Sequence, residues 1–179
     1  MRNMGIRMAT LLLISTLALS LFAACSGTAG KTSPAKLLTY KNEEFGYSIS
    51  YPGDWKIEVA DKGKTSLVTP ISANSIGSVR IDAIPSVPIA TAAQSWEMAM
   101  ATQWSTLTRH ENKKIQGQWD WYLSYGWTTD KGVEFLGQAY FKYTPNYVYK
   151  VDTAAKAVEY YKYPFNTIIS SFKVLERSK

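Results

Sequence analysis

The sequence has a single cysteine, Cys25, among 179 residues, so no disulfide can form within the chain. A domain without disulfides must bury a sufficient apolar core, and a chain of this length, read as one domain, is long enough to do so. It contains six tryptophans and twelve tyrosines. Because aromatic side chains both fill cores and line binding surfaces, this abundance alone does not separate structure from function.

Residues for catalysis and metal binding are equally scarce. His110 is the only histidine, and histidine-based zinc sites usually need more than one imidazole. Its position between Arg109 and Glu111, just past a predicted helix, indicates a solvated loop residue. The sequence has no G-x-S-x-G nucleophile elbow, no phosphate-binding glycine-rich loop and no EF-hand-like acidic run. We therefore expect no enzyme activity, no metal and no cofactor, although dispersed carboxylates leave a hydrolase open as an alternative.

Basic residues form no cluster that would bind nucleic acid. The formal net charge is +6, and removal of residues 1–24 would take away two of the 20 basic residues and none of the acidic ones. The only adjacent basic pair is Lys113-Lys114. Nucleic-acid binding needs a basic stripe, so we expect no nucleic-acid partner.

No uncharged apolar run reaches the about 20 residues that a membrane-spanning helix needs. The Leu-rich run 9–22 follows Arg2 and Arg7, which is typical of a secretion signal. Residues 21–25 (LFAAC) resemble the lipobox of bacterial lipoproteins, in which cleavage precedes the cysteine and its sulfur carries a diacylglycerol. The resemblance implies lipid attachment at Cys25. The alternative is an ordinary secretory signal that leaves Cys25 as a free thiol or a small buried residue.

Three segments are expected: a signal peptide at 1–24, a lipidated cysteine with a flexible tether at 25–36, and one domain at 37–179. Residues 26–35 (SGTAGKTSPA) are small and polar, and a coil of about ten such residues spans roughly 15–20 Å. This tether would hold the domain just clear of the lipid head groups. The expected location is the outer leaflet of the cytoplasmic membrane, or an outer membrane if one exists.

Most of the domain alternates between apolar and polar residues, which predicts strands. The expected strands are 45–51, 55–59, 65–69, 78–83, 115–128, 133–143 and 147–153. Short loops at 129–132 and 144–146 imply antiparallel neighbours, because parallel pairing needs a long crossover.

Two segments have helical periodicity instead. Thr91 and Gln94 form a predicted capping box for a helix that ends near Thr108. Its apolar stripe consists of Trp96, Met100, Trp104 and Leu107. Pro164 favours the first turn of a second helix, whose stripe is Phe165, Ile168, Ile169 and Phe172. Each helix has one apolar face, so the sequence predicts an α+β domain with an antiparallel sheet of about six strands sandwiched by helices.

Residues 45–57 (FGYSISYPGDWKI) resemble the opening hairpin of PsbP-like proteins. The C-terminal segments 147–151 (YVYKV) and 168–173 (IISSFK) are similar to the end of that domain. The family includes an extrinsic subunit of the photosystem II oxygen-evolving complex and many bacterial lipoproteins. The resemblance implies an antiparallel sheet sandwiched by helices and no enzyme.

The aromatic run after Gly117 contains the candidate binding residues. In one strand, five side chains would share a face: Trp119, Trp121, Leu123, Tyr125 and Trp127. They form either core beneath a helix, next to Trp96 and Trp104, or a platform for a sugar, peptide or aromatic ligand. The opposite face would carry Tyr122, Gln138, Tyr140 and Lys142, as an open polar-aromatic patch or as packed tyrosines with their tips at the rim. The candidate binding residues are Trp119, Trp121, Tyr122, Tyr140 and Lys142.

The function expected from these patterns is a lipid-anchored, extracytoplasmic, non-enzymatic accessory or interaction domain. The expected partners are the membrane, through the N-terminal lipid, and a protein of the cell envelope. The first alternative is a small-ligand or glycan-binding lipoprotein that uses an aromatic cleft. The second alternative is a cell-envelope hydrolase.

Overall fold

The computed structural model describes residues 36–61, 64–72 and 76–176. Contacts divide the chain into residues 1–34 and 35–179, of which the second forms one compact unit. The signal peptide, Cys25 and the tether lie outside the described residues, so the expectations for them stay predictions.

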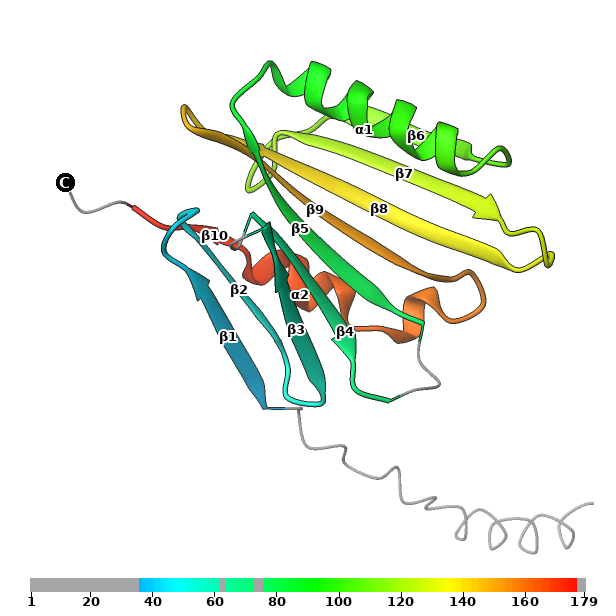
Figure 1. The fold of residues 1–179 in the computed structure, drawn as a ribbon, viewed down its shortest axis with the longest axis horizontal. Helices are drawn as coiled ribbons and strands as arrows, with labels where there is room; N and C mark the ends of the chain where they lie inside the picture. The colour runs from blue at the N-terminus through cyan, green and yellow to red at the C-terminus, as the bar shows by residue number, and fades with distance from the viewer. Residues whose placement is uncertain (1–35, 62–63, 73–75, 177–179) are drawn as a thin grey trace, which may run out of the picture. The chain divides into compact units, whose positions relative to one another are not determined.

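The larger of two sheets has seven strands, and every neighbouring pair is antiparallel (Figure 1). In sheet order the strands are β3 (Trp55–Ala60), β4 (Thr65–Pro70), β5 (Ser78–Pro85), β9 (Tyr147–Lys156), β8 (Glu134–Tyr143), β7 (Trp121–Thr128) and β6 (Thr108–Lys114). Helix α1 (Ile89–Gln103) lies in the connection from β5 to β6. This long connection lets β6 form the far edge of the sheet.

The smaller sheet has three strands, with β2 (Tyr47–Pro52) between β1 (Leu37–Asn42) and β10 (Lys173–Val174). The 3-10 helix η2 (Tyr160–Lys162) and helix α2 (Phe165–Ser171) lead from β9 to β10. The predicted α+β class is thus confirmed, with seven strands in the main sheet rather than about six. Strand β2 was predicted at 45–51, but its place in a second sheet, and strands β1 and β10, were not.

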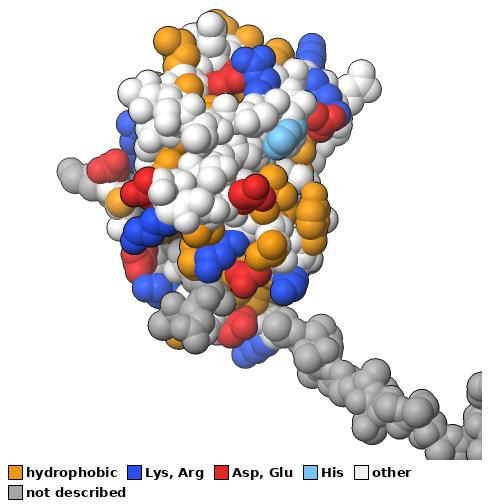
Figure 2. Space-filling model, turned by 90° about the vertical axis from the view of Figure 1, so that its right-hand side faces the viewer, with side chains coloured by type: hydrophobic (Ala, Val, Ile, Leu, Met, Phe, Trp, Pro, Cys, Tyr) orange, Lys and Arg blue, Asp and Glu red, His pale blue; other side chains and the backbone are white. Residues whose placement is uncertain are grey.

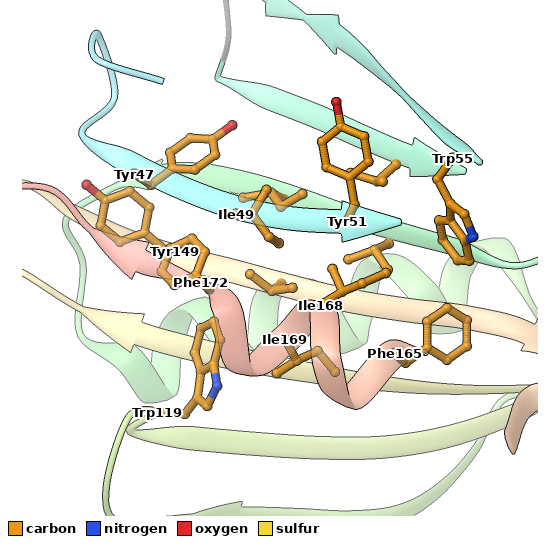
Figure 3. Close-up of a cluster of buried hydrophobic side chains, with 14 of the residues drawn as sticks. Tyr47, Ile49, Tyr51, Trp55, Trp119, Tyr149, Phe165, Ile168, Ile169 and Phe172 are labelled. Atoms are coloured by element: carbon orange, nitrogen blue, oxygen red, sulfur yellow. The ribbon is translucent and has the colours of Figure 1, made fainter. Parts of the chain in front are cut away.

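One core lies between the small sheet, α2 and the main sheet (Figure 3). The apolar stripe of α2 is buried as its spacing predicts, and Pro164 is the N-cap of the helix. Phe172 stacks on Tyr47 of β2, with ring centroids 5.9 Å apart. Full burial of one large apolar side chain stabilises a fold by about 1.5–3 kcal/mol. The two segments that resemble PsbP-like proteins therefore meet in one core.

A second core lies between α1 and β7, β8 and β9. Trp96 and Trp104 of α1 pack on Tyr125 and Trp127, with centroid distances of 4.8 and 5.6 Å. These contacts confirm the interpretation that the face of Tyr125 and Trp127 is core beneath a helix. The helix begins at Ile89, with Pro88 as N-cap, and no side chain caps it. The predicted capping box at Thr91 is therefore wrong, and the helix ends at Gln103 rather than near Thr108.

The predicted strand 115–128 begins later than expected, because the chain turns at residues 115–120. Gly117 has a φ of 110°, which favours glycine and breaks the extended run. β7 starts only at Trp121, and the preceding residues 108–114 form β6. His110 therefore lies on a strand, at a bulge between Arg109 and Glu111, and not in a loop. It is exposed, as expected.

Candidate functional site

Helix α1 covers one face of β7 and β8, and the opposite face holds a patch of half-buried polar and aromatic side chains. Strand pairing aligns Lys113, Tyr122 and Tyr140 in one row across β6, β7 and β8. The next row contains Glu111, Ser124 and Gln138. In the main sheet β5 and β9 face the small sheet and α2, whereas β6 to β8 extend past them (Figure 1). The face thus remains accessible where these two rows lie.

The tyrosines of this face contact one another and order the polar groups between them. The rings of Tyr122 and Tyr140 are 5.0 Å apart. The hydroxyl of Tyr140 donates to Oε1 of Gln138 at 3.0 Å. The amide N–H groups of Gln138 take no part in this bond. Cross-strand aromatic pairs of this kind hold side chains in fixed positions, so the patch is preorganised.

The segment after β9 forms one wall of a pocket of about 420 Å³ on this face. Tyr160 is buried, and its hydroxyl lies 2.6 Å from Oγ1 of Thr153, whereas the adjacent Tyr161 is 83% exposed. The lining consists of His110, Glu111, Tyr122, Ser124, Tyr125, Leu136, Gly137, Gln138, Tyr160 and Tyr161. We call this the tyrosine pocket. Aromatic walls with a few polar groups are typical of small-molecule sites.

Burial keeps Tyr122, which lines the pocket, and the neighbouring Tyr140 of the same face protonated. Burial, with a smaller contribution from Tyr122, raises the pKa of Tyr140 to about 12. The pKa of Tyr122 is also raised by burial. At neutral pH both side chains are therefore hydrogen-bond donors and flat apolar surfaces, and neither is a nucleophilic phenolate.

A second, smaller pocket of about 240 Å³ adjoins the first, with His110 and Leu136 lining both. Figure 2 shows the histidine at the surface, near acidic and hydrophobic side chains. Gly126 lies beneath it, and a β-carbon at Gly126 would come 3.1 Å from Nε2 of His110. The two pockets form one extended depression across β6, β7 and β8.

The candidate residues predicted from the sequence fall into three places. Tyr122 and Tyr140 lie together on the open face, as the polar-aromatic patch requires. Trp119 does not share a face with Trp121: it is buried in the first core, with ring centroids 5.0 Å from Phe172 and 5.6 Å from Tyr140. The shared Trp face is therefore wrong for Trp119, because the turn before β7 carries it to the other side of the sheet. The other two candidates, Trp121 and Lys142, each bond to a nearby side chain outside the patch.

Trp121 belongs to the α1 side, where its indole N–H donates to Oδ1 of Asn112 at 2.7 Å. Lys142 lies on the open face, and its ammonium group is 3.1 Å from Oδ1 of Asp120. The other oxygen of Asp120 accepts the backbone N–H of Tyr143 at 2.8 Å. Lys142 thus has a local partner at one edge of the patch. Neither residue lines the tyrosine pocket.

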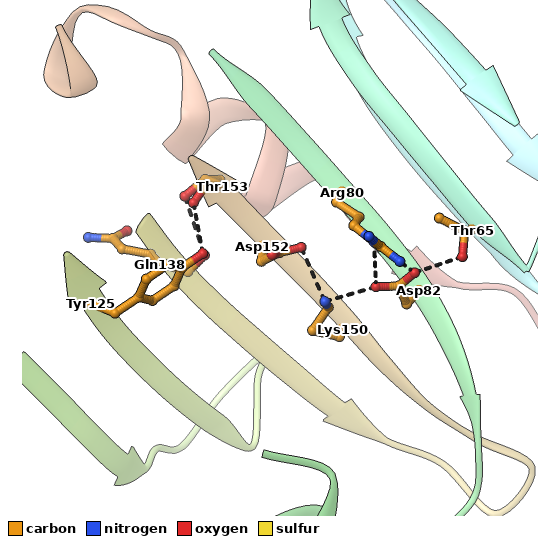
Figure 4. Close-up of polar contacts among 8 residues, drawn as sticks. All are labelled: Thr65, Arg80, Asp82, Tyr125, Gln138, Lys150, Asp152 and Thr153. Atoms are coloured by element: carbon orange, nitrogen blue, oxygen red, sulfur yellow. Dashed lines mark hydrogen bonds and ion pairs between the residues drawn. The ribbon is translucent and has the colours of Figure 1, made fainter. Parts of the chain in front are cut away.

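A group of buried charges lies on the α1 side of β5 and β9 (Figure 4). Lys150 is 3% exposed, with its ammonium group 2.8 Å from Asp82 and 3.5 Å from Asp152. Burial opposes ionisation of Asp82, but Lys150, Thr65 and Arg80 together lower its pKa. For Asp152 burial dominates and raises the pKa, despite Lys150. Lys150 thus compensates two carboxylates in the interior, and this group has a structural role.

The described residues contain no group of three or more His, Cys, Asp or Glu side chains that could hold a metal ion. Within the same residues, no helix is long and apolar enough to cross a bilayer.

The sequence did not indicate Tyr160, Tyr161 or Glu111 as site residues. Residues 158–163 (VEYYKY) have no strand or helix periodicity, and Glu111 lies in a polar run without apolar alternation. The adjacent tyrosines are at most a weak signal, because Tyr160 is buried and only Tyr161 is exposed. Their position depends on how the chain folds back after β9.

No family model matches the chain, and no curated protein matches it by sequence. Solved structures do match. The Saccharomyces cerevisiae Ran-binding protein Mog1p has a TM-score of 0.55 at 7% identity, over 79% of this chain and 97% of that protein. LpqN, involved in cell envelope biogenesis of Mycobacterium tuberculosis, has a TM-score of 0.50 at 11% identity, over 82% and 88%.

The cyanobacterial PsbP (CyanoP) of Synechocystis has a TM-score of 0.49 at 18% identity, over 83% of this chain and 98% of that protein. At such identities a structural match shows a shared fold alone. Mog1p is matched over nearly its whole length, so the shared part is the complete architecture of that protein. The described domain therefore shares the α+β fold of Mog1p, in agreement with the fold class that the sequence predicts.

Proposed function

We propose that this chain is a lipid-anchored, extracytoplasmic accessory protein that binds an envelope partner through the open face of β6, β7 and β8. The observation that carries the proposal is the patch around Tyr122 and Tyr140, whose side chains are half-buried at the edge of the first core and which strand pairing preorganises. Tyrosine is enriched at protein interfaces because it combines a large apolar surface with a hydrogen-bonding tip. The proposed protein has no catalytic activity of its own.

The anchor is the part of the proposal that the sequence supports, through the lipobox-like residues 21–25. A Cys25→Ala variant is expected to leave the membrane fraction and to appear in the soluble extracytoplasmic fraction. If the variant remained membrane-bound after the signal is cleaved, lipid anchoring at Cys25 would be refuted.

Photo-crosslinking in intact cells tests the partner. A benzophenone amino acid at Tyr161, which is 83% exposed beside the pocket, is expected to capture one recurrent envelope protein. The matched control is the same amino acid at Met98, which is 64% exposed on α1. Equal, diffuse adducts from both positions would contradict a partner specific to the open face.

A second candidate function is favoured by the pocket itself, whose volume of about 420 Å³ suits one sugar or small aromatic molecule. The wall residues Tyr122 and Tyr161 offer faces for stacking, and Gln138 and Glu111 offer polar groups. A glycan screen with the purified protein, followed by isothermal titration with Tyr161→Ala, tests this function. A ligand whose affinity is unchanged in Tyr161→Ala does not use the tyrosine pocket.

A further inference from the structure

We infer that the end of the domain where β1 begins is a lipid-contact surface, which rests in the headgroup region of the membrane. The inference rests on the proposed anchor at Cys25, and it adds a second contact that the anchor alone does not require. We call this end the tether end. It is formed by the start of β1, the β2–β3 turn, the end of β4, the start of β5 and the η2–α2 junction (Figure 1).

Hydrogen bonds join the segments of the tether end into one surface. The backbone N–H of Gly53 donates to the carbonyl of Lys36 at 2.8 Å, which links the β2–β3 turn to the residue before β1. The N–H of Ile71 donates to the carbonyl of Asp54 at 2.9 Å. The N–H of Ile76 donates to the hydroxyl of Tyr163 at 3.2 Å. The end is therefore a defined surface and not a set of independent loops.

Three aliphatic side chains are exposed on this surface. Leu37 is 46% exposed, Ile71 61% and Ile76 45%. Single exposed apolar side chains are common on proteins. Three on connected segments at one end are typical of a contact site, and aliphatic residues at the boundary of head groups and acyl chains contribute to interfacial binding.

The charges at the tether end are compatible with a lipid surface. Lys36 and Lys162 are exposed there, and one carboxylate, Asp54, lines the same shallow pocket as Ile71 and Lys162. The two lysines slightly outweigh the acid, so anionic head groups are attracted rather than repelled. With so small an excess, the apolar side chains supply most of the contact.

The chain between the lipid and the domain is short and joins the domain at the start of β1. The tether end is therefore the end that meets the membrane. Ten residues, 26–35, separate Cys25 from Lys36. Even fully extended they span at most about 35 Å, and as a coil far less. A domain held this closely by its β1 end samples the lipid surface with that end at high effective concentration. Weak apolar contacts are then sufficient for docking.

Site-specific lipid quenching tests the inference, because Cys25 is the only native cysteine and is blocked in the lipidated protein. The mature lipoprotein with Ile76→Cys is labelled with a fluorophore and reconstituted into vesicles of phosphatidylcholine with a minor fraction of phosphatidylglycerol. We expect headgroup-nitroxide lipids to quench this label several-fold more strongly than a label at Met98→Cys. The difference is expected to persist in high salt, since the contact is mainly apolar.

A second variant separates docking from tethering. In the double variant Leu37→Ser, Ile71→Ser, quenching of the Ile76→Cys label is expected to fall to the level of the Met98→Cys label. These residues are exposed, so thermal unfolding is expected to be unchanged. Loss of vesicle flotation by the labelled protein would overturn the anchor and the docking together. Flotation with equal quenching at both positions, or a label shielded from water but not quenched by lipid, would overturn the docking alone.

Discussion

The ring of Tyr125 lies directly over Gly137, in the space that a β-carbon at Gly137 would occupy. The two residues are partners in the β7–β8 ladder, and Tyr125 is in turn held from above by Trp96 of α1. Because glycine has no side chain, Gly137 of β8 leaves room for the ring of Tyr125 of β7. This contact sets how closely α1 approaches the sheet.

The first prediction concerns this contact. Gly137→Ala is expected to destabilise the domain by about 1–3 kcal/mol, because the buried ring cannot move without disturbing the α1 core. Urea unfolding of the soluble domain measures the change. The control is the same substitution in a Tyr125→Leu background, where the ring is absent and the cost of the alanine is expected to fall. An equal cost in both backgrounds would show that the ring is not responsible.

The second prediction concerns Lys150, which compensates two interior carboxylates. Lys150→Met is expected to cost about 3–5 kcal/mol at neutral pH, because Asp82 and Asp152 then lack their buried partner. The matched control is Lys142→Met, which breaks a half-exposed pair with Asp120 and is expected to cost less than about 1 kcal/mol. Equal costs for the two substitutions would refute the compensating role.

The same group gives a pH dependence with a definite sign. The folded-state pKa of Asp82 is lowered, so its contribution to stability is present above the unfolded pKa and is lost as pH falls through the folded one. Asp152 has a raised pKa and acts in the opposite direction, favouring the folded state when protonated. Without Lys150, the domain folds more easily when the Asp82 and Asp152 side chains are protonated and therefore uncharged. The deficit of Lys150→Met relative to wild type is therefore expected to shrink between pH 7 and about pH 4, as followed by urea unfolding; a constant deficit would contradict it.

The third prediction concerns Tyr140 of the open face in alkaline solution. The pKa of Tyr140 is raised to about 12, so stability is fully present below the ordinary tyrosine pKa of about 10 and is lost as pH rises through the folded value. Tyr140→Phe is expected to weaken this alkaline loss. Unfolding free energies at successive pH values above neutrality, together with phenolate absorbance, measure it. Early ionisation of Tyr140 in the folded protein would mean that the open face is less buried than described.

The fourth prediction uses Trp119 as a reporter of the open face. Its indole is buried against Tyr140, whereas Trp121 lies on the α1 side. A ligand bound against Tyr140 on the open face is expected to shift tryptophan emission in wild type and in Trp121→Phe, and by much less in Trp119→Phe. Retention of the full shift in Trp119→Phe would place the ligand elsewhere.

The helices and the core were predictable because their signals are local. Trp96, Met100 and Trp104 fall on one stripe at helical spacing, and the stripe packs on the sheet as expected. β6 was not predictable, since its residues (TRHENKK) have no apolar alternation and every one is exposed. The strand is held by backbone pairing with β7 and by polar side-chain contacts with Glu97 of α1 and Trp121 of β7.

The site was predictable in part for a similar reason. Tyr122 and Tyr140 were placed on one face because strand alternation fixes which way a side chain points. Trp119 was misplaced, because alternation was carried back from β7 into residues 115–120, where the chain turns. Tyr161 was missed, because its position depends on the path of the chain after β9 and not on any pattern within residues 158–163.

Strand β6 is an exposed edge of the main sheet, which matters where many copies of a protein lie close together. Its outer side presents backbone groups to which a strand of another molecule would add, and proteins confined to one surface meet one another far more often than in solution. Charged side chains and a bulge discourage such pairing, and β6 carries three basic residues, one glutamate and a register break at Arg109 and Glu111. These features are expected to disfavour pairing of β6 with the edge strand of a neighbouring copy.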